Sequence, residues 1–578
     1  MSLIARYRKG TIGYLVLPAK KRSVKSSARN RQRVGLLIVA FAIGYAAIAV
    51  RLLQYGYFSE SEATASIPRS PNIIASRPDI LDRNGQLIAT DINLISLYAE
   101  PRRVVDANEA IEKLASVVPD LDWADLHRKL TSDSGFQWIR RQLTPRQEAE
   151  IMRLGIPGIG FRPEKRRFYP GGPVASHIVG HVNIDNQGLA GIERYLDRQG
   201  LADLRGVGLT DPTQLEPVRL SIDLRVQSIV HNVVSDALRN YQAEAAGAVI
   251  IDVDTGEVLA MASVPDYDPN EPSRRLADGT IDRDYEKGWF NRMSNSAVEM
   301  GSTFKAFTLA MGIDAGVVTL NSVVDASRPL KMGGFTIRDF HGRGRPLTIR
   351  EVFRYSSNIG TAKVADLVGL ENHQQFLFRL GLLSKMQTEL PEIASPTAPR
   401  NWKKINSATI SFGHGLATTP LQTAAAAAAL VNGGMFRHPT FIADSGRRHQ
   451  ITGRRVLQAS TSAKVRELFW YNGTQGSGRN AQVAGFDVGG KTGTAEKVIN
   501  GKYAKNLNFN TFLAAFPMHR PRYLVLSIID APLSGERGGR LAAFNAAPMV
   551  RDIIERAAPL LGVRPSFGNP QASPLMNY

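Results

Sequence analysis

Cysteine is absent from this 578-residue chain, and acidic residues are absent from its first 33 residues. Without cysteine the protein has no disulfide, thiolate zinc site, iron–sulfur cluster or cysteine nucleophile. Long apolar runs are also scarce, because only residues 34–50 form one, and this excludes a polytopic membrane protein. A hydrophobic fraction of 43% excludes wholesale disorder. Since a single core rarely exceeds about 250–300 residues, we expect at least two domains.

The N-terminus combines a basic tail with that single apolar run. Residues 1–33 hold ten Lys or Arg, so they account for 10 of the 19 net positive charges. An apolar helix over 34–53 is just long enough to cross a membrane, since Arg33 and Arg51 can snorkel. The positive-inside rule then places the tail in the cytoplasm and exports the rest. A cleaved signal peptide is the alternative, but it has a shorter core and a small-residue cleavage site. This membrane topology accounts for the basic charge of the tail, so nucleic acid is not needed as a partner to explain it.

Changes in composition divide the remaining chain. The predicted organisation is a cytoplasmic basic tail (1–33), a transmembrane helix (34–53), a linker (54–72), an elongated pedestal domain (73–230), a second domain (231–565) and a C-terminal tail (566–578). In the pedestal, extended segments are expected around the Asn84-Gly85 turn, and residues 107–155 have amphipathic helical patterns. Residues 161–197 are dense in turn residues and precede a strand and a long helix over 218–241.

The second domain has the pattern of an α+β fold. Residues 248–264 predict a β-hairpin, and three further strands are predicted over 484–497, 510–517 and 522–530, before a final helix. The block between them, 302–435, reads as mostly helical. We therefore expect an antiparallel sheet, flanked by helices, that is built from both ends of the segment.

Three short motifs in this domain contain candidate catalytic residues. In EMGSTFKAF, Ser302 and Lys305 are three residues apart at a predicted helix start, so the amine can reach the hydroxyl. The helix N-terminus favours negative charge on that oxygen, and a desolvated lysine can act as a base. Ser356 and Asn358 in RYSSNIG offer a hydroxyl and an amide, although a helix N-cap is the plainer interpretation.

The third motif is a glycine-containing stretch on a predicted strand. Lys491 supplies positive charge, and Thr492 and Thr494 supply hydroxyls suited to a carboxylate. Gly493 allows a ligand to approach the backbone closely, although an ordinary strand with a glycine also fits. No motif is specific alone. Their order, with 54 residues from Ser302 to Ser356 and 135 more to Lys491, is that of active-site serine penicillin-binding enzymes.

At these residues the chain resembles class B penicillin-binding proteins, the monofunctional peptidoglycan D,D-transpeptidases. The resemblance covers nearly the whole chain, with a pedestal of the penicillin-binding protein dimerisation type and a transpeptidase domain. Within class B it is most similar to septal cell-division enzymes of the penicillin-binding protein 3 type. Met300 departs from the proline that many relatives have there. Supporting stretches are LDRNGQLIA (81–89), RRFYPGG (166–172), GLAGIERYLD (188–197), SIDLRVQ (221–227) and SFGHGLATTPLQ (411–422).

The resemblance implies a mechanism and a set of partners. Ser302 attacks the penultimate D-Ala of a stem peptide and forms an acyl-enzyme that a neighbouring stem's amino group resolves into a crosslink. Lys305 is the implied base, Ser356 and Lys491 move protons, Asn358 holds the peptide, and Thr492 with Thr494 binds its carboxylate. The implied partners are lipid-linked peptidoglycan, nascent glycan strands, β-lactams, a membrane glycan polymerase and division proteins. No metal or organic cofactor is implied, and the implied location is the inner membrane at the septum, with a periplasmic catalytic domain.

Other interpretations fit less well. His177 and His181 have the spacing of zinc ligands, but Ile178 replaces the glutamate of a zinc protease. His341 and His414 are lone histidines in glycine-rich segments. A class A β-lactamase needs a deacylating glutamate motif that we do not find. A side-wall transpeptidase, a non-catalytic division scaffold and a β-lactam sensor remain alternatives, and a bifunctional synthase would need a glycosyltransferase domain unlike this pedestal.

Overall fold

The computed structural model describes residues 77–199, 216–276, 278–443, 453–499, 501–533 and 539–567, together with parts of 39–49. In the predicted anchor, the described residues 39, 41–46 and 48–49 are helical and exposed. Among the described residues, no helix is long and apolar enough to cross a membrane. Most of residues 34–53, and all of the predicted tail and linker, lie outside the described residues. The anchor therefore stays a prediction.

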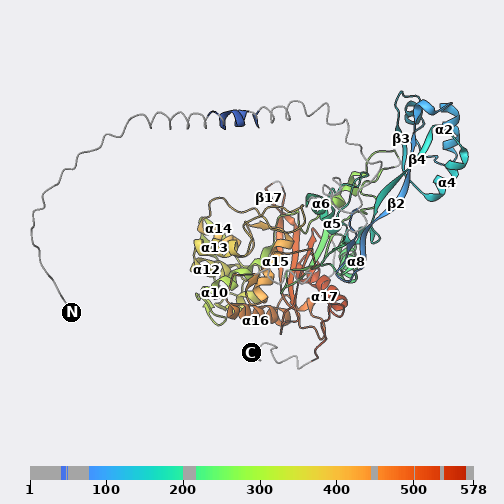
Figure 1. Ribbon diagram of the computed structural model, residues 1–578. Coiled ribbons are helices and arrows are strands. Elements are labelled where there is room, and N and C mark those ends of the chain that lie inside the picture. The colour runs from blue at the N-terminus through green and yellow to red at the C-terminus, as the bar shows by residue number, and fades with distance from the viewer. Residues whose placement is uncertain are drawn as a thin grey trace, which may run out of the picture. The chain divides into compact units, whose positions relative to one another are not determined.

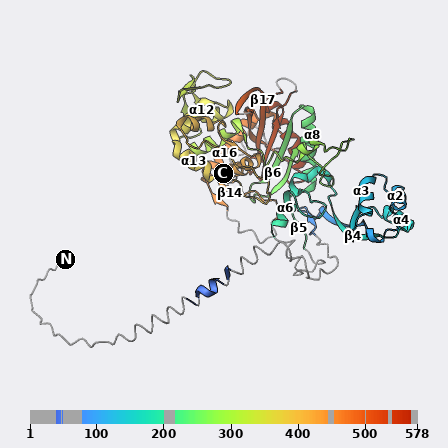
Figure 2. The same ribbon diagram turned by 90° about the horizontal axis from the view of Figure 1, so that it is seen from above.

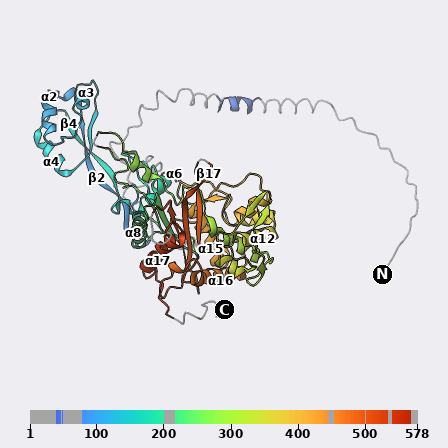
Figure 3. The ribbon, with the colours of Figure 1, turned by 180° about the vertical axis from the view of Figure 1, so that it is seen from behind.

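The region predicted to form the pedestal is built on a five-stranded sheet. Its order is β3-β2-β1-β5, and β4 pairs antiparallel with Thr90–Ala99 of β2. The helices α2, α3 and α4 gather around β2 and β4 (Figures 2 and 3). The elements are β1 (Ile80–Leu81), β2 (Leu87–Ala99), η1 (Pro101–Arg103), α2 (Ala107–Ala115), α3 (Trp123–Leu130), β3 (Gln137–Leu143), α4 (Pro145–Leu154), β4 (Ile159–Phe168), η2 (Gly172–Ala175), α5 (Ser176–Val179), α6 (Gly191–Arg198) and β5 (Val218–Arg219).

Local sequence explains where these helices begin. Asp106 and Asp122 accept hydrogen bonds from the first free backbone amides of α2 and α3. Thr144 and Gln147 form a capping box at α4. The helices over 107–115 and 145–154 confirm the amphipathic patterns. The helical prediction over 107–155 is wrong at β3, and the strand β4 was not predicted, because the charged residues of both strands hide the alternation of a strand.

A buried ion network joins the pedestal strands to α6. Glu193 accepts hydrogen bonds from Arg77 Nε at 2.7 Å and from Arg167 Nε at 2.6 Å. Arg167 also pairs with Asp91 at 3.1 Å, and Arg77 with Asp197 at 2.6 Å. Although burial lowers it, the pKa of Arg167 is raised overall by Glu193 and Asp91. Every buried charge in this network therefore has an opposite charge beside it.

The second region contains the predicted antiparallel sheet, with order β16-β17-β18-β6-β7 (Figure 1). Two strands come from the start of the segment and three from its end, as predicted. Its elements are α8 (Leu224–Asn240), β6 (Ala245–Asp252), β7 (Val258–Val264), α9 (Arg283–Glu286), η3 (Lys287–Trp289), β8 (Val298–Glu299), η4 (Gly301–Phe304), α10 (Lys305–Asp314), β9 (Val323–Val324), β10 (Leu330–Met332), β11 (Phe335–Ile337), β12 (Leu347–Thr348), α11 (Ile349–Arg354), α12 (Asn358–Val368), α13 (Leu370–Arg379), α14 (Lys404–Ile410), β13 (Ala417–Thr418), α15 (Pro420–Val431), β14 (Met435–Phe436), β15 (Arg454–Arg455), α16 (Ala459–Gln475), η5 (Arg479–Ala481), β16 (Gly489–Ile499), β17 (Lys502–Phe516), β18 (Tyr523–Asp530), η6 (Ala542–Phe544) and α17 (Ala546–Ala557).

Side chains on the two faces of the sheet enter different cores. Ala248 and Ile250 of β6 pack with α8 and α17, whereas Val249 and Ile251 pack with the helical block that includes α10 and α15. This alternation is the period of two that a strand imposes. Helix α15 is buried along its whole length. The sheet is therefore a middle layer with helices on both sides (Figure 1).

Candidate active site

Ser302 lies where the helical block meets the edge of the sheet. It is half-buried on the 3-10 turn η4, immediately before α10. Gly301 precedes it with φ +53°, and a Cβ there would lie 2.7 Å from the carbonyl oxygen of Thr494 on β16. A side chain at this position would push the turn away from the strand. Glycine therefore holds the Ser302 backbone close to that of Thr494.

Lys305 is the centre of a hydrogen-bonded cluster. Its side chain is fully buried, and its Nζ lies 2.9 Å from Ser302 Oγ and 3.0 Å from Ser356 Oγ. It donates to the backbone carbonyl of Ser356 and to Asn358 Oδ1, both at 2.7 Å. The nitrogen thus has four polar neighbours, one more than the three hydrogens of an ammonium. A neutral amine would donate to the two carbonyl oxygens and keep its lone pair for a hydroxyl proton.

Electrostatics favour that neutral form. Burial lowers the pKa of Lys305 well below its usual range, and the charge of Lys491 lowers it further, while Asp339 opposes both. Lys491 is also fully buried, and its burial lowers its pKa to about 7. Its Nζ donates to Ser356 Oγ at 3.1 Å and lies 5.8 Å from the centre of the Phe353 ring. The Ser356 hydroxyl therefore lies between two lysine amines.

The turn that carries Ser356 is held by a residue that the sequence analysis did not identify. Ser356 has a left-handed backbone with φ +56°, and Ser357 is the N-cap of α12. The N-cap interpretation is thus right for Ser357, which leaves Ser356 and Asn358 to face Lys305. Asp339 accepts hydrogen bonds from Ser357 Oγ at 2.7 Å and from the Ile359 amide at 2.9 Å. Nothing in its spacing along the chain singles out Asp339.

The other predicted residues follow Lys491 along β16. Thr492 Oγ1 and Ser477 Oγ are 2.7 Å apart, and Thr494 Oγ1 accepts from the Ala542 amide at 3.4 Å. A Cβ on Gly493 would lie 2.4 Å from the carbonyl oxygen of Met300, so only glycine fits beside the segment that precedes Ser302. The structure thus joins Ser302, Lys305, Ser356, Asn358 and Lys491 directly and places Thr492, Gly493 and Thr494 on the adjoining strand.

The alternative histidine site is not assembled. His177 Nε2 lies 2.7 Å from the carbonyl of Gly288, and His181 Nδ1 lies 3.0 Å from Tyr267 Oη. Across the described ranges, no group of three His, Cys, Asp or Glu is arranged to hold a metal ion. Burial lowers the pKa of both histidines to about 4, so they are neutral structural side chains at pH 7.

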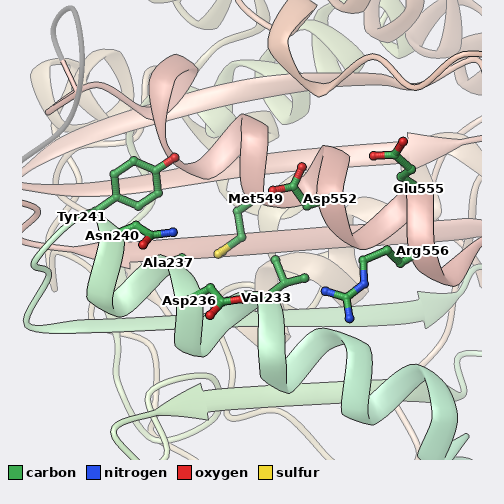
Figure 4. Close-up of a pocket in the computed structure, with 9 residues that line it drawn as sticks. All are labelled: Val233, Asp236, Ala237, Asn240, Tyr241, Met549, Asp552, Glu555 and Arg556. Carbon is green, nitrogen blue, oxygen red and sulfur yellow. The ribbon is translucent and has the colours of Figure 1, made fainter.

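One cavity lies away from this chemistry. It has a volume of about 310 Å³ between α8 and α17, and Figure 4 shows Tyr241, Asp552 and Glu555 around it. None of the residues in the Lys305 cluster lines it. The candidate active site is therefore identified by its hydrogen-bonded groups and not by this cavity.

Comparison with known proteins matches two parts of the chain to family models. The family model "Penicillin binding protein transpeptidase domain" matches residues 246–555, and "Penicillin-binding Protein dimerisation domain" matches residues 72–206. A Caulobacter vibrioides protein named "Probable peptidoglycan D,D-transpeptidase FtsI" is 38% identical over 537 residues, which cover 91% of this chain and 86% of the relative. "Probable peptidoglycan D,D-transpeptidase PenA" of Neisseria meningitidis serogroup A is 33% identical and covers 95% of this chain and 96% of the relative. "Peptidoglycan D,D-transpeptidase FtsI" of Escherichia coli K12 is 31% identical, with 82% of each chain covered.

Proposed function

The chain belongs to the penicillin-binding proteins with dimerisation and transpeptidase domains, and from this we propose how its residues crosslink peptidoglycan. The observation that carries the proposal is the contact of 2.9 Å between the buried Lys305 amine and the Ser302 hydroxyl. A neutral amine at this distance can take the serine proton as the oxygen attacks a carbonyl. The reaction is acyl transfer from a stem peptide that ends in D-Ala-D-Ala.

In the first half-reaction Ser302 Oγ bonds to the carbonyl carbon of the penultimate D-Ala. The peptide bond to the terminal D-Ala breaks, and Ser356 with Lys491 supplies the proton that the leaving amine needs. The backbone amides of Ser302 and Thr494 stabilise the negative charge on the carbonyl oxygen. Asn358 holds the peptide amide, and Thr492 with Thr494 binds the terminal carboxylate. In the second half-reaction the amine of a neighbouring stem takes the acyl group and frees Ser302.

The cellular setting is also part of the proposal. Residues 34–53 anchor the chain in the inner membrane, residues 1–33 stay in the cytoplasm, and the pedestal and transpeptidase domains lie in the periplasm at the septum. The chain then acts on lipid-linked peptidoglycan beside a separate glycan polymerase and other division proteins. The names of the Caulobacter and Escherichia relatives support the septal rather than the side-wall role. A reporter fused to residue 1 should be active only in the cytoplasm, and a periplasmic signal would contradict this topology.

Covalent labelling tests the proposed nucleophile. The full-length protein in detergent should form a 1:1 adduct with a penicillin, and peptide mapping should find it on Ser302. Ser302→Ala should fold normally and form no adduct. Labelling of a different serine, or no labelling of a folded protein, would overturn the assignment. A Ser302→Ala chain that still supports division would favour the scaffold alternative, and midcell or side-wall localisation of the wild type separates the two transpeptidase roles.

A further inference from the structure

The loop that follows β11 is tied to the active site at two points. The backbone carbonyl of Arg338 accepts a hydrogen bond from Asn358 Nδ2 at 3.0 Å. Five residues further along the loop, the guanidinium of Arg343 lies over the ring of Tyr355, which directly precedes Ser356. Ser356 and Asn358 both belong to the hydrogen-bonded cluster of the active site. The loop therefore borders that cluster on the side of the helical block.

Tyr355 holds two arginine side chains. Arg343 Cζ lies 4.2 Å from the centre of the Tyr355 ring, and Arg354 Cζ lies 5.1 Å from the same point. Packing on an aromatic ring fixes a guanidinium by its flat face and leaves the N–H groups at its edge available to a ligand. Arg354 donates one of these groups to Tyr471 Oη at 3.3 Å, and within its described part the structure gives Arg343 no hydrogen bond. The two arginines therefore offer oriented donors with few partners.

The carboxylates on neighbouring segments do not neutralise these two cations. Glu351 pairs with Arg345 at 2.6 Å, and the hydrogen bond from Arg345 is the main cause that lowers the pKa of Glu351 to about 2. Asp339 accepts its hydrogen bonds from the turn at the start of α12. Neither Arg343 nor Arg354 forms an ion pair with any Asp or Glu that the structure describes. Because like charges this close repel each other, an anion beside the two arginines is attracted.

The same loop exposes an aromatic side chain. Phe340 is 80% exposed, and its ring centre lies 4.6 Å from that of His341, which is also exposed. Aromatic residues and arginine are the side chains most enriched where proteins bind partners. The loop therefore places apolar contact surface beside the positive charge of Arg343.

The proposed mechanism leaves this side of the active site to the acceptor. The terminal carboxylate of the donor lies beside the threonines of β16, so the donor occupies the side of the sheet. In the second half-reaction the acceptor nitrogen bonds to the acyl carbon, and the bond from that carbon to Ser302 Oγ breaks. The proton that the amine loses passes through Ser356 and Lys305 to Ser302 Oγ. The amine must therefore lie beside Ser356, close to the loop after β11.

We propose that Arg343 and Arg354, held on the ring of Tyr355, bind a carboxylate of the acceptor stem while its amine attacks the acyl-enzyme. This inference rests on the proposed function, because it takes the donor to lie along β16 and the acyl group to lie on Ser302. The ligand is the carboxylate at the C-terminal end of the acceptor stem. Phe340 supplies apolar surface beside it.

Two acceptors that differ only in one charge test the proposal. Both are short stem peptides with a free side-chain amine and a single D-Ala at the end, which is a carboxylate in one and a carboxamide in the other. The full-length protein in detergent is acylated by a D-alanyl thioester, and the ratio of transfer product to hydrolysis product is measured. The carboxylate acceptor should give a ratio about threefold to tenfold higher, as expected for a partly exposed charge-assisted contact. Added salt should shrink this preference, and equal ratios would overturn the proposal.

Variants identify the charges that produce the preference. Arg343→Gln and Arg354→Gln each remove a cation and keep a polar side chain, and the double variant should lose most of the preference. Arg343→Lys keeps the charge without the planar guanidinium and should keep part of the preference. The control Arg102→Gln removes an exposed pedestal arginine and should keep all of it. A preference that survives unchanged in the double variant would contradict the proposal.

Penicillin labelling separates this inference from the proposed function. If Ser302 is labelled and the two acceptors give equal ratios, the transpeptidase mechanism stands and the arginine site is wrong. If the double variant slows labelling and leaves the acceptor preference unchanged, the arginines act on the donor, and the assignment to the acceptor is wrong. If Ser302 is not labelled and neither acceptor is used, the proposed function itself fails. Arg343→Glu reverses an exposed charge and should make the carboxamide acceptor the better one.

Discussion

Buried cationic side chains occur in the pedestal and in the candidate active site, and their ion-pair partners differ between the two places. In the pedestal, Arg77 and Arg167 share Glu193, and each has a further carboxylate partner. In the active site, Lys305 and Lys491 are as deeply buried but have no ion-pair partner in the described part of the chain. Paired arginines stay charged and hold the fold, whereas unpaired lysines lose affinity for protons and become available as bases. The difference separates the structural charges of the pedestal from the lysines that we propose as catalytic.

The largest effect is expected when the Lys305 amine is replaced. Arginine stays protonated at every accessible pH, and glutamine stays neutral but takes up no proton at pH 7. Lys305→Arg and Lys305→Gln should each slow penicillin acylation by at least about a hundredfold, the usual effect of losing a positioned base. Stopped-flow acylation measures this, and thermal unfolding checks that both variants fold. Near-normal acylation by a folded variant would move the base role to Lys491.

A substitution in the pedestal should lower the free energy of unfolding and leave the acylation rate unchanged. Glu193→Gln leaves Arg77 and Arg167 without their shared counter-charge, and breaking such a buried pair costs about 3–5 kcal/mol. Urea unfolding of the full-length protein should detect this loss, while the folded variant should acylate at the wild-type rate. Glu112→Gln, on the exposed face of α2, serves as the control. A loss below about 1 kcal/mol would show that the two arginines do not depend on Glu193.

A smaller effect is expected from the residue that holds the Ser356 turn. Asp339→Asn keeps an oxygen for one of the bonds from Ser357 and Ile359 but loses the charge that strengthens both. Acylation should slow about tenfold, equivalent to about 1.4 kcal/mol of barrier. Stability should change little in urea, because the turn is local. Unchanged acylation kinetics would mean that Ser357 alone holds the turn in place.

The contrast between local spacing and distant partners explains which features the sequence could predict. Ser302 and Lys305 are only three residues apart, and the strands of the large sheet have apolar patterns. Local spacing was therefore enough to predict the contact and the sheet. The strands β3 and β4 were missed because they are rich in arginine. Arg141 pairs with Glu164 and Asp185, and Arg167 pairs with Glu193. No local sequence pattern predicts these ion pairs.

Asp339, Arg343 and Tyr355 were missed for the same reason. Asp339 reaches the Ser356 turn from a loop, and Arg343 of the same loop packs on Tyr355. Such residues gain their roles from tertiary contacts, and their spacing along the chain does not predict those contacts. The motif order predicted the groups that we propose to react, whereas the groups that position them required the structure.

The pH dependence of acylation tests the central claim most directly. An ordinary lysine has a pKa of about 10.4, so its neutral form increases about tenfold per pH unit up to that value. Burial lowers the pKa of Lys491 to about 7 and that of Lys305 well below its usual range, so both amines become neutral at a lower pH than an ordinary lysine does. The acylation rate constant of the wild type should therefore stop rising with pH well before the range in which an ordinary lysine loses its proton. A rate constant that continues to rise about tenfold per unit from pH 8 to 9.5 would contradict the account, because the lysines beside Ser302 would then titrate as exposed ones do.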